Sequence, residues 1–282
     1  MVKVLVTGAD GQLGQAIKSV AGNYNSFIIY YAARTEADIT NIDQIEKLFE
    51  KIKPDYCINT AAYTAVDRAE VEADKAYAVN AVGAGNIAAI CKKHNTVLLH
   101  ISTDFVFDGL NTTPYKEMDV PNPLNVYGKT KLDGEIKIAA EMRNYYIIRT
   151  SWLYSDFGNN FMKTMLRLAH EKNEINVVND QTGTPTNAID LAFVLLHIIT
   201  HDNSKFGIYN FSNEGKASWY DFAKKIFEIN EINIALHPIP ASSYPTPAKR
   251  PAYSVLDKNK IINNFGIKIN DWAQSLKPIK II

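Results

Sequence analysis

The N-terminal half of the chain alternates short apolar runs with amphipathic stretches. Five runs rich in β-branched and aromatic residues read as buried strands: Val2–Thr7, Phe27–Ala32, Tyr56–Asn59, 97–102 and Tyr145–Thr150. Apolar positions at helical spacing fill the gaps between them, around Ala16 and over Ile42–Ile52, 73–94 and 125–142. This alternation predicts an α/β fold, a doubly wound parallel sheet of the Rossmann type with helices on both faces.

The second half is less regular and predicts a smaller, mixed lobe over 152–282. Helical spacing recurs over Phe161–Glu171, 189–199 and Trp219–Ile229, and short strands are expected at 175–178 and 208–211. Five prolines fall within 236–251, which excludes a regular helix or a central strand there. We expect this proline-rich segment to cross the surface as a loop that lines a site.

Composition adds little to the fold prediction, but it bears on which classes of binding partner are expected. The chain has 282 residues with 30 basic and 30 acidic side chains, which gives no electrostatic case for nucleic acid or an anionic membrane. Its two cysteines and six histidines lack metal-ligand spacing, so we expect no metal. The chain starts directly with a strand, and its most apolar stretch, 191–200, is too short for a bilayer, so a cytoplasmic location is expected.

A glycine-rich turn joins the first strand to the first helix. Gly8, Gly11 and Gly14 have G-x-x-G-x-x-G spacing, with Gln12 and Leu13 between the last two. Strand, glycine turn and helix form the context of a dinucleotide fingerprint, in which the helix N-terminus faces the pyrophosphate. We therefore expect a dinucleotide-binding domain over 1–151, with elements from about 184–212 returning to it.

Further candidate cofactor residues follow the second and third strands. Arg34 stands near the end of the second strand, where no acid is present to bind a ribose. Its presence favours NADPH over NADH. An arginine that is simply exposed on the surface is a nearly equal alternative. Asp38 and Ile39 are expected near the adenine. Small residues after the third strand would let a ribose and phosphate lie against the backbone, or would simply pack tightly: Ala61 and Ala62, followed by Tyr63.

Tyr127 and Lys131 are four residues apart on one predicted helix and therefore share a face. A phenol ionises near pH 10, and an ammonium group one turn away favours the phenolate, so we expect a lowered pKa for Tyr127. Such a pair suits proton donation to a carbonyl oxygen as hydride arrives. Thr103 follows the fourth strand, where its hydroxyl either helps to bind the same oxygen or bonds its own backbone.

Several longer segments, taken together, resemble the extended short-chain dehydrogenase/reductase superfamily. Within it, they resemble the dTDP-4-dehydrorhamnose reductase family, from the first strand to about Asp257. The segments are 62–70 (AYTAVDRAE), 102–109 (STDFVFDG), 123–131 (PLNVYGKTK), 149–152 (RTSW), 158–161 (GNNF), 179–181 (NDQ), 183–186 (GTPT) and 244–251 (YPTPAKRP).

The resemblance implies reduction of the C4 ketone of dTDP-4-dehydro-6-deoxy-L-mannose to dTDP-L-rhamnose by NADPH or NADH. It makes Tyr127 the proton donor, Lys131 the residue that lowers its pKa and holds the nicotinamide ribose, and Thr103 the third catalytic member. The dTDP-sugar would be contacted by Thr103, Asp104, Phe105, Tyr127, Trp152 and Arg250, with the Arg250 guanidinium on the diphosphate.

Two alternatives stay open at this point. One is a sister 4-ketoreductase that yields the talose epimer, since hydride face depends on small differences in sugar placement. The other is a non-catalytic dinucleotide-binding regulatory subunit, against which the intact Thr103, Tyr127 and Lys131 argue. A homodimer is also an open expectation. Gln15 stands where the resemblance would place an acidic residue that bridges a metal between subunits, so no metal-linked dimer is expected.

Overall fold

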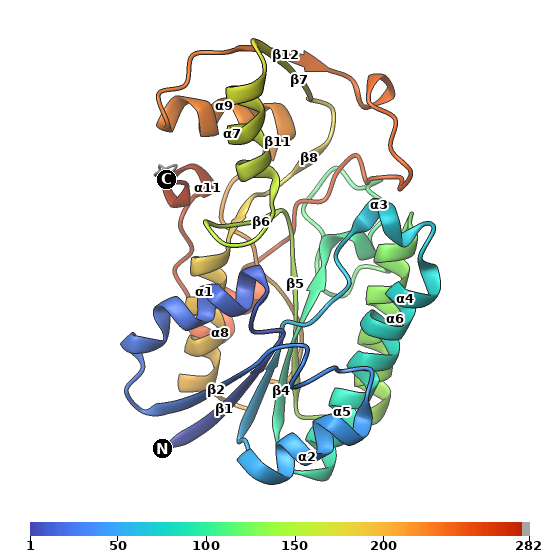
Figure 1. Cartoon of the computed structure of the whole chain (residues 1–282), viewed down its shortest axis with the longest axis vertical. Coiled ribbons are helices and arrows are strands. Elements are labelled where there is room, and N and C mark those ends of the chain that lie inside the picture. Colours follow the sequence, from blue (N-terminus) through green and yellow to red (C-terminus); the bar gives the residue numbers. More distant parts are fainter. Residues whose placement is uncertain (278–282) are drawn as a thin grey trace.

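The computed structural model describes residues 1–277 and has a six-stranded parallel sheet at its centre (Figure 1). The strand order is β10-β5-β4-β3-β1-β2. The strands are β1 (Val2–Thr7), β2 (Phe27–Ala32), β3 (Tyr56–Asn59), β4 (Val97–Thr103), β5 (Tyr145–Thr150) and β10 (Gly207–Asn210). The order reverses between β1 and β3, and ligands of such sheets bind beyond the C-terminal strand ends at this switch point.

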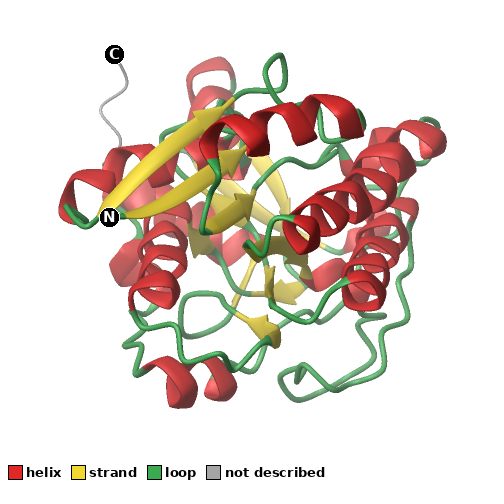
Figure 2. Ribbon diagram, turned by 90° about the horizontal axis from the view of Figure 1, so that it is seen from below, coloured by secondary structure: helices red, strands yellow, loops and turns green. Residues whose placement is uncertain are grey.

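Helices cover both faces of the sheet, as predicted (Figure 2). One face carries α1 (Gln12–Val20) and α8 (Ala188–Thr200), which pack against each other. The other face carries α2 (Ile42–Ile52), α5 (Ala84–Lys93) and α6 (Val126–Glu141). The predicted α/β, doubly wound Rossmann-type class is therefore confirmed.

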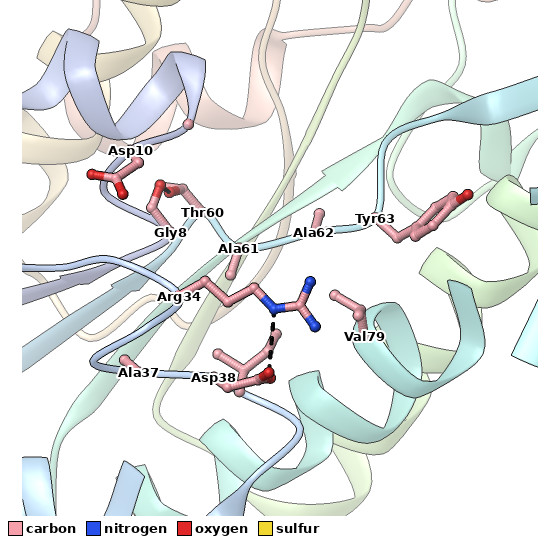
Figure 3. Close-up of a pocket in the computed structure, with 12 residues that line it drawn as sticks. Gly8, Asp10, Arg34, Ala37, Asp38, Thr60, Ala61, Ala62, Tyr63 and Val79 are labelled. Carbon is pink, nitrogen blue, oxygen red and sulfur yellow. Dashed lines mark hydrogen bonds and ion pairs between the residues drawn. The ribbon is translucent and has the colours of Figure 1, made fainter. Parts of the chain in front are cut away.

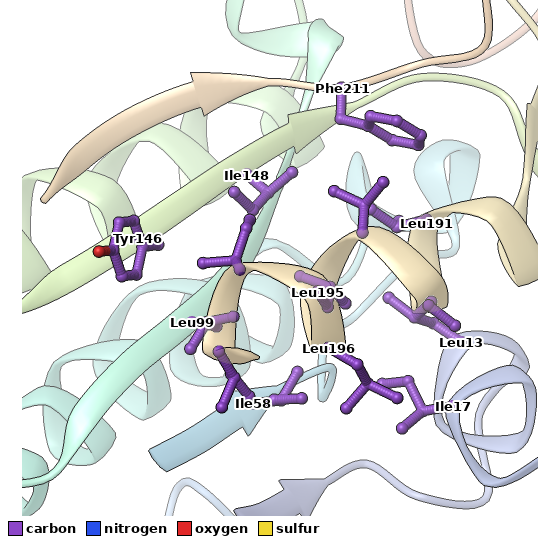
Figure 4. Close-up of a cluster of buried hydrophobic side chains, with 14 of the residues drawn as sticks. Leu13, Ile17, Ile58, Leu99, Tyr146, Ile148, Leu191, Leu195, Leu196 and Phe211 are labelled. Atoms are coloured by element: carbon purple, nitrogen blue, oxygen red, sulfur yellow. The ribbon is translucent and has the colours of Figure 1, made fainter. Parts of the chain in front are cut away.

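The core on the α1 side joins segments that are far apart in the sequence. Val4 and Val6 of β1 point into it, whereas Leu5 between them points to the opposite face, as the two-residue period of a strand requires. Figure 4 shows side chains of α1 and α8 packed with those of β3, β4 and β5. Ile261 and Phe265 of α10 (Asn259–Phe265) lie in the same core.

A smaller lobe lies beyond the C-terminal ends of the strands (Figure 1). Its elements are β6 (Leu153–Tyr154), α7 (Phe161–Glu171), β7 (Glu174–Val178), β8 (Thr182–Gly183), β9 (Thr186–Asn187), β11 (Ala217–Ser218), α9 (Trp219–Ile229), β12 (Ala235–Ile239) and α11 (Trp272–Ser275). Phe222 of α9 is fully buried between α7 and β7 side chains. Ser218 and Asp221 start α9 with a reciprocal capping box, which explains the sharp boundary found there.

Two predicted elements need correction. In place of the single helix expected over 73–94, the structure has α4 (Ala73–Tyr77), a π-helical segment η2 (Ala78–Gly83) and α5. A short helix, α3 (Val66–Ala69), precedes them. The 236–251 segment is not loop throughout, because β12 pairs in parallel with β7. Pro238 is tolerated because this is a two-stranded sheet, in which each strand has a free edge.

Within the described residues, 1–277, the fold also has three short 3₁₀ turns: η1 (Ala21–Asn23), η3 (Asp104–Val106) and η4 (Ala241–Ser243). None of the helices within residues 1–277 has both the length and the apolar character needed to cross a membrane.

Candidate active site

The glycine turn after β1 is shaped by close backbone contacts. Gly8 has a positive φ of 70°, and a Cβ atom on it would lie 2.6 Å from the backbone nitrogen of Ala61. The Gly11 N–H donates to the Gly8 carbonyl at 2.9 Å, which closes the turn. A Cβ atom on Gly14 would meet the Ala9 backbone at 2.6 Å. Only glycine fits at Gly8 and Gly14, so the first and last positions of the motif are required by the backbone itself.

The turn opens onto a cavity of about 240 Å³ at the β1/β3 switch point (Figure 3). Gly11 precedes α1 without a side-chain cap, so N–H groups of the first helical turn remain free to bind an anion. The cavity is lined by Gly8, Asp10, Gly11, Arg34, Ala37, Asp38, Ile39, Thr60, Ala61, Ala62, Tyr63 and Val79. Most of the predicted cofactor residues are thus brought together.

Arg34 extends over this cavity, and its side chain is 79% exposed (Figure 3). Its Nε donates to Asp38 Oδ2 at 3.2 Å, while Asp38 Oδ1 accepts from both the backbone and the hydroxyl of Thr40. The terminal nitrogens of Arg34 are therefore left to meet an anionic group. The hydroxyl and guanidinium groups beside Asp38 hold the pKa of that carboxyl below its usual value, against the opposing effect of burial.

Gln12 does not line the cavity but joins the two lobes. Its Nε2 donates to the carbonyl of Leu153 at 3.1 Å, and its Oε1 accepts from Asn160 Nδ2 at 2.7 Å. Asn160 is also the N-cap of α7. The side chain at the start of α1 is therefore fixed to the first strand and the first helix of the smaller lobe.

The helix that carries Tyr127 and Lys131 is anchored at its first turn. Asn125 is its N-cap, accepting from the Gly128 N–H at 2.8 Å and donating through Nδ2 to the Lys249 carbonyl at 2.8 Å. The Val126 N–H donates to Glu70 Oε1 at 2.9 Å. The position of Tyr127 is consequently set by α3 and by the proline-rich segment, as well as by its own helix.

Thr103, Asp104, Phe105 and Tyr127 form one cluster where β4 ends. The Phe105 ring meets the Tyr127 ring edge-on, with centroids 5.8 Å apart. The Thr103 hydroxyl donates to Asp104 Oδ1 at 3.1 Å and accepts from the Phe105 N–H at 3.2 Å. Asp104 is 2% exposed, and this burial raises the pKa of its carboxyl to about 7. A carboxyl whose pKa is about 7, a hydroxyl and a phenol thus lie together where β4 ends.

The lowered pKa expected for Tyr127 is wrong for this structure. Burial raises the pKa of Tyr127 to about 12; the nearby Thr103 hydroxyl acts to lower it, and the Asp104 charge adds to the rise. The expected partner, Lys131, is on the same helix face and is buried. Its amine, however, is not directed at the phenol.

The Lys131 amine points into the sheet. Nζ donates to the carbonyl of Ile101 at 2.6 Å and lies 3.4 Å from Nε2 of His100, both on β4. Burial lowers the pKa of Lys131 to about 8, and the charge of Glu135 opposes this effect. The helical spacing predicts which helix face carries Lys131, but it does not show which groups the amine at the end of this flexible side chain contacts.

Trp152 lies just after β5, in strained backbone with a φ of 46°. Its indole stacks on that of Trp219 with centroids 3.5 Å apart and planes within 7°. A Cβ atom on Gly183 would lie 2.6 Å from the Trp152 ring, so glycine is needed at that position. Trp219 was not among the predicted site residues, since a helix-start tryptophan carries no distinctive sequence signal.

Arg250 is engaged with an acidic side chain in this structure. Its Nη1 and Nη2 donate to Asp67 Oδ1 and Oδ2 at 3.0 and 2.8 Å. The Ala248 N–H also donates to Asp67 Oδ1 at 3.2 Å. The fork that we predicted to bind a diphosphate therefore holds the proline-rich segment against α3.

Comparison with known proteins shows which family the chain resembles. The RmlD substrate binding domain model matches residues 2–280. A dTDP-4-dehydrorhamnose reductase of Aggregatibacter actinomycetemcomitans is 43% identical, over 99% of this chain and 99% of its own. The solved reductase of the same name from Clostridium acetobutylicum has a TM-score of 0.93 and 43% identity, covering 98% of this chain and 97% of its own. That from Bacillus anthracis, solved in complex with NADP, has a TM-score of 0.92 and 40% identity, covering 98% and 97%.

The chain belongs to the dTDP-4-dehydrorhamnose reductase family.

The sequence analysis of this family member also missed Asn80, which supports the site from within. Asn80, in the π-helical segment, accepts from the Tyr63 N–H at 2.8 Å and donates to the Tyr63 carbonyl at 3.0 Å. Its Nδ2 also reaches the Thr130 hydroxyl at 3.1 Å. Asn80 thus links the turn after β3 to the Tyr127 helix. An asparagine within an Ala-rich helix was the available signal, because such a residue is a poor helix former and needs a reason to be there.

Proposed function

We propose that this protein is an NAD(P)H-dependent reductase that converts dTDP-4-dehydro-6-deoxy-L-mannose to dTDP-L-rhamnose. The observation that carries the proposal is the cluster of Thr103, Asp104 and Tyr127 beside the glycine-turn cavity, in a chain whose full-length relatives are named dTDP-4-dehydrorhamnose reductase. A proton donor next to a dinucleotide site is the arrangement that ketone reduction needs.

The residues of the cavity fit a dinucleotide. The Gly8 turn packs directly on the Ala61 backbone at the cavity, and the uncapped start of α1 offers N–H groups to a pyrophosphate. We assign cofactor contacts to the predicted set: Gly8, Gly11, Gln12, Leu13, Gly14, Arg34, Asp38, Ile39, Ala61, Ala62, Tyr63, Tyr127 and Lys131. When bound, the reduced nicotinamide supplies the hydride.

Tyr127 would donate its proton to the C4 oxygen. A phenol whose pKa is about 12 is fully protonated at neutral pH and is ready to act as the acid. The Thr103 hydroxyl would donate to the same oxygen and share its developing charge. Lys131 would hold the nicotinamide ribose and, as an ammonium group, stabilise the phenolate that remains after proton transfer.

Substrate contacts are proposed for Thr103, Asp104, Phe105, Tyr127, Trp152 and Arg250. Because the pKa of Asp104 is about 7, its carboxyl can donate a hydrogen bond to a sugar oxygen as well as accept one. The stacked Trp152 offers a rigid apolar face, which suits a deoxysugar. Arg250 is suited to the diphosphate once it leaves Asp67, since both partners present two acceptor oxygens.

We further propose a division of labour between the lobes. Residues 1–151 with the returning elements of about 184–212 would bind the cofactor, and 152–282 would mainly bind the sugar nucleotide. Packing of α8 and pairing of β10 with β5 support this division, and α10 adds a later segment to the first lobe. We place the enzyme in the cytoplasm and propose self-association as a homodimer.

The test is oxidation of NADPH and NADH, followed at the nicotinamide absorbance, with the 4-dehydro sugar generated in situ and the product identified by NMR. Turnover to dTDP-L-rhamnose is expected. Formation of the talose epimer would instead assign a sister ketoreductase activity. Dinucleotide binding without turnover would overturn the enzyme proposal in favour of a regulatory role.

A further inference from the structure

A row of polar side chains crosses the sheet beneath the site. Thr7 of β1, Asn59 of β3 and His100 of β4 occupy the same register level on three neighbouring strands. Each is at most 1% exposed. On the same strands, Leu5, Cys57 and Leu98 lie in the apolar core of that face. Three buried polar groups in one row beside this apolar core call for a defined hydrogen-bond pattern, because an unpaired one would be costly.

The orientation of the Asn59 amide is fixed by a backbone group. The Ala61 N–H donates to Asn59 Oδ1 at 3.1 Å, and the Thr7 hydroxyl donates to the same atom at 2.8 Å. A backbone N–H can only donate, so the atom facing it must be the amide oxygen. The other end, Nδ2, lies 3.0 Å from His100 Nδ1. That end can only donate.

This orientation decides the tautomer of His100. Its Nδ1 must accept from Asn59, so the proton of the neutral imidazole sits on Nε2. Burial, aided by the charge of Lys131, lowers the pKa of His100 well below its usual value, so the ring is neutral. The Nε2 atom lies 3.4 Å from Lys131 Nζ. His100 therefore presents an N–H, not a lone pair, to the lysine.

An ammonium group cannot accept that N–H, whereas an amine can. Lys131 Nζ already donates one hydrogen to the Ile101 carbonyl, and a neutral amine would direct its lone pair at His100. The charge of Glu135 on α6 favours the ammonium form, but its carboxylate is engaged by Arg149 of β5 through contacts of 2.7 to 3.3 Å.

We propose that Asn59 and His100 are positioning residues for Lys131: Asn59 fixes the imidazole proton on Nε2, and that N–H opposes protonation of the lysine, whose amine is turned away from Tyr127 until the site is loaded. The role of Asn59 and His100 in catalysis rests on the function proposed above. Neither residue touches the reacting atoms. Binding of the cofactor ribose and formation of the Tyr127 phenolate would then draw the Lys131 ammonium group towards the site.

The first test is NMR of the full-length, cofactor-free protein with ¹⁵N-labelled histidine. His100 is identified among the six histidines by loss of its signals in His100→Gln. The expected result is a neutral ring with the proton on Nε2 across the pH range in which the protein is folded. A proton on Nδ1, or a charged ring at neutral pH, in the wild-type protein would overturn the proposal.

The second test follows the ¹³Cε signal of Lys131, assigned by its loss in Lys131→Arg, through a pH titration. We expect the amine to lose its proton near pH 8 in the wild type. In Asn59→Asp, the new carboxylate would accept a hydrogen bond from His100 Nδ1. The ring proton would then sit on Nδ1, and Nε2 would present a lone pair to the Lys131 ammonium group. The Lys131 pKa should then rise by roughly one unit or more.

Thr7→Val is the matched control, because it removes one donor to Asn59 but leaves the Ala61 N–H to orient the amide. The His100 tautomer should not change in it. The proposal would be contradicted if Lys131 stayed charged through pH 10 in the wild type. It would also be contradicted if the Lys131 pKa did not rise in Asn59→Asp. Both readings are made without substrate, so a failed reductase assay would count against the proposed function and leave them unaffected.

Discussion

Arg250 and Asp67, 183 residues apart in the sequence, form a two-pronged ion pair that joins the proline-rich segment to α3. Both side chains retain solvent contact, so the pair adds little to stability. The contribution of this ion pair is to hold the Arg250 side chain in a defined geometry. The Asp67 carboxylate presents two oxygens to the guanidinium, as a substrate diphosphate would, and keeps the fork extended at the edge of the site.

Arg250→Lys keeps the charge but removes the fork. We expect KM for the dTDP-sugar to rise about tenfold, while kcat stays within about threefold, because the lost contact is remote from the reacting carbon. Steady-state kinetics at saturating NADPH measures both values, with the exposed Arg143→Lys as the control. An unchanged KM would remove Arg250 from substrate binding and leave it as a link between two segments.

Tyr127→Phe removes the proposed acid but keeps the ring that packs on Phe105. General acid catalysis contributes about 10²- to 10⁴-fold, so kcat should fall by that factor. NADPH binding, measured by fluorescence titration, should change by less than about threefold, since most cofactor contacts remain. The exposed Tyr77→Phe is the control. Turnover close to wild type in Tyr127→Phe would assign the proton donor elsewhere.

Arg34 is expected to set cofactor preference. Its terminal nitrogens are free while Asp38 holds Nε, so a 2′-phosphate can bind there by charge-assisted hydrogen bonds. Arg34→Ala should raise KM for NADPH by roughly tenfold or more and leave KM for NADH nearly unchanged. Parallel assays with the two cofactors measure the ratio. Equal losses with both would mean that Arg34 contacts a part of the cofactor that they share.

Asp104 makes stability depend on pH in an unusual direction. Its pKa is about 7 in the folded protein and near 3.8 when unfolded. The stability that its protonated form contributes is fully present below about pH 4 and is lost as pH rises through 7. Asp104→Asn should abolish this loss, worth up to roughly 4 kcal/mol, while lowering reductase activity.

Thermal unfolding of the wild type and of Asp104→Asn between pH 4 and 8 measures the effect. The difference in Tm between them should grow in favour of the variant as pH rises. Asp156→Asn, at an exposed carboxyl, should show no such trend. A difference that stays constant with pH would mean that Asp104 ionises normally in the folded protein.

The sheet and the glycine turn could be predicted because local pattern and backbone sterics decide them. The run at β1 and the spacing of Gly8, Gly11 and Gly14 are visible in the sequence itself. The direction of the Lys131 amine could not be predicted, because its partners on β4 are about 30 residues away. The π-helical turn at Asn80 also escaped, since it depends on hydrogen bonds to Tyr63 and Thr130 that only the folded chain supplies.

The return of α8 and β10 to the first sheet has a consequence for synthesis of the chain. When the ribosome has released only the first 151 residues, β5 is an open edge strand and the apolar side of α1 has no cover. Both are completed only after residue 210 has emerged, once much of the smaller lobe has been made. The N-terminal half is therefore an unfinished intermediate, exposed to aggregation during translation, and a truncation at 151 would yield insoluble protein instead of an isolated cofactor domain.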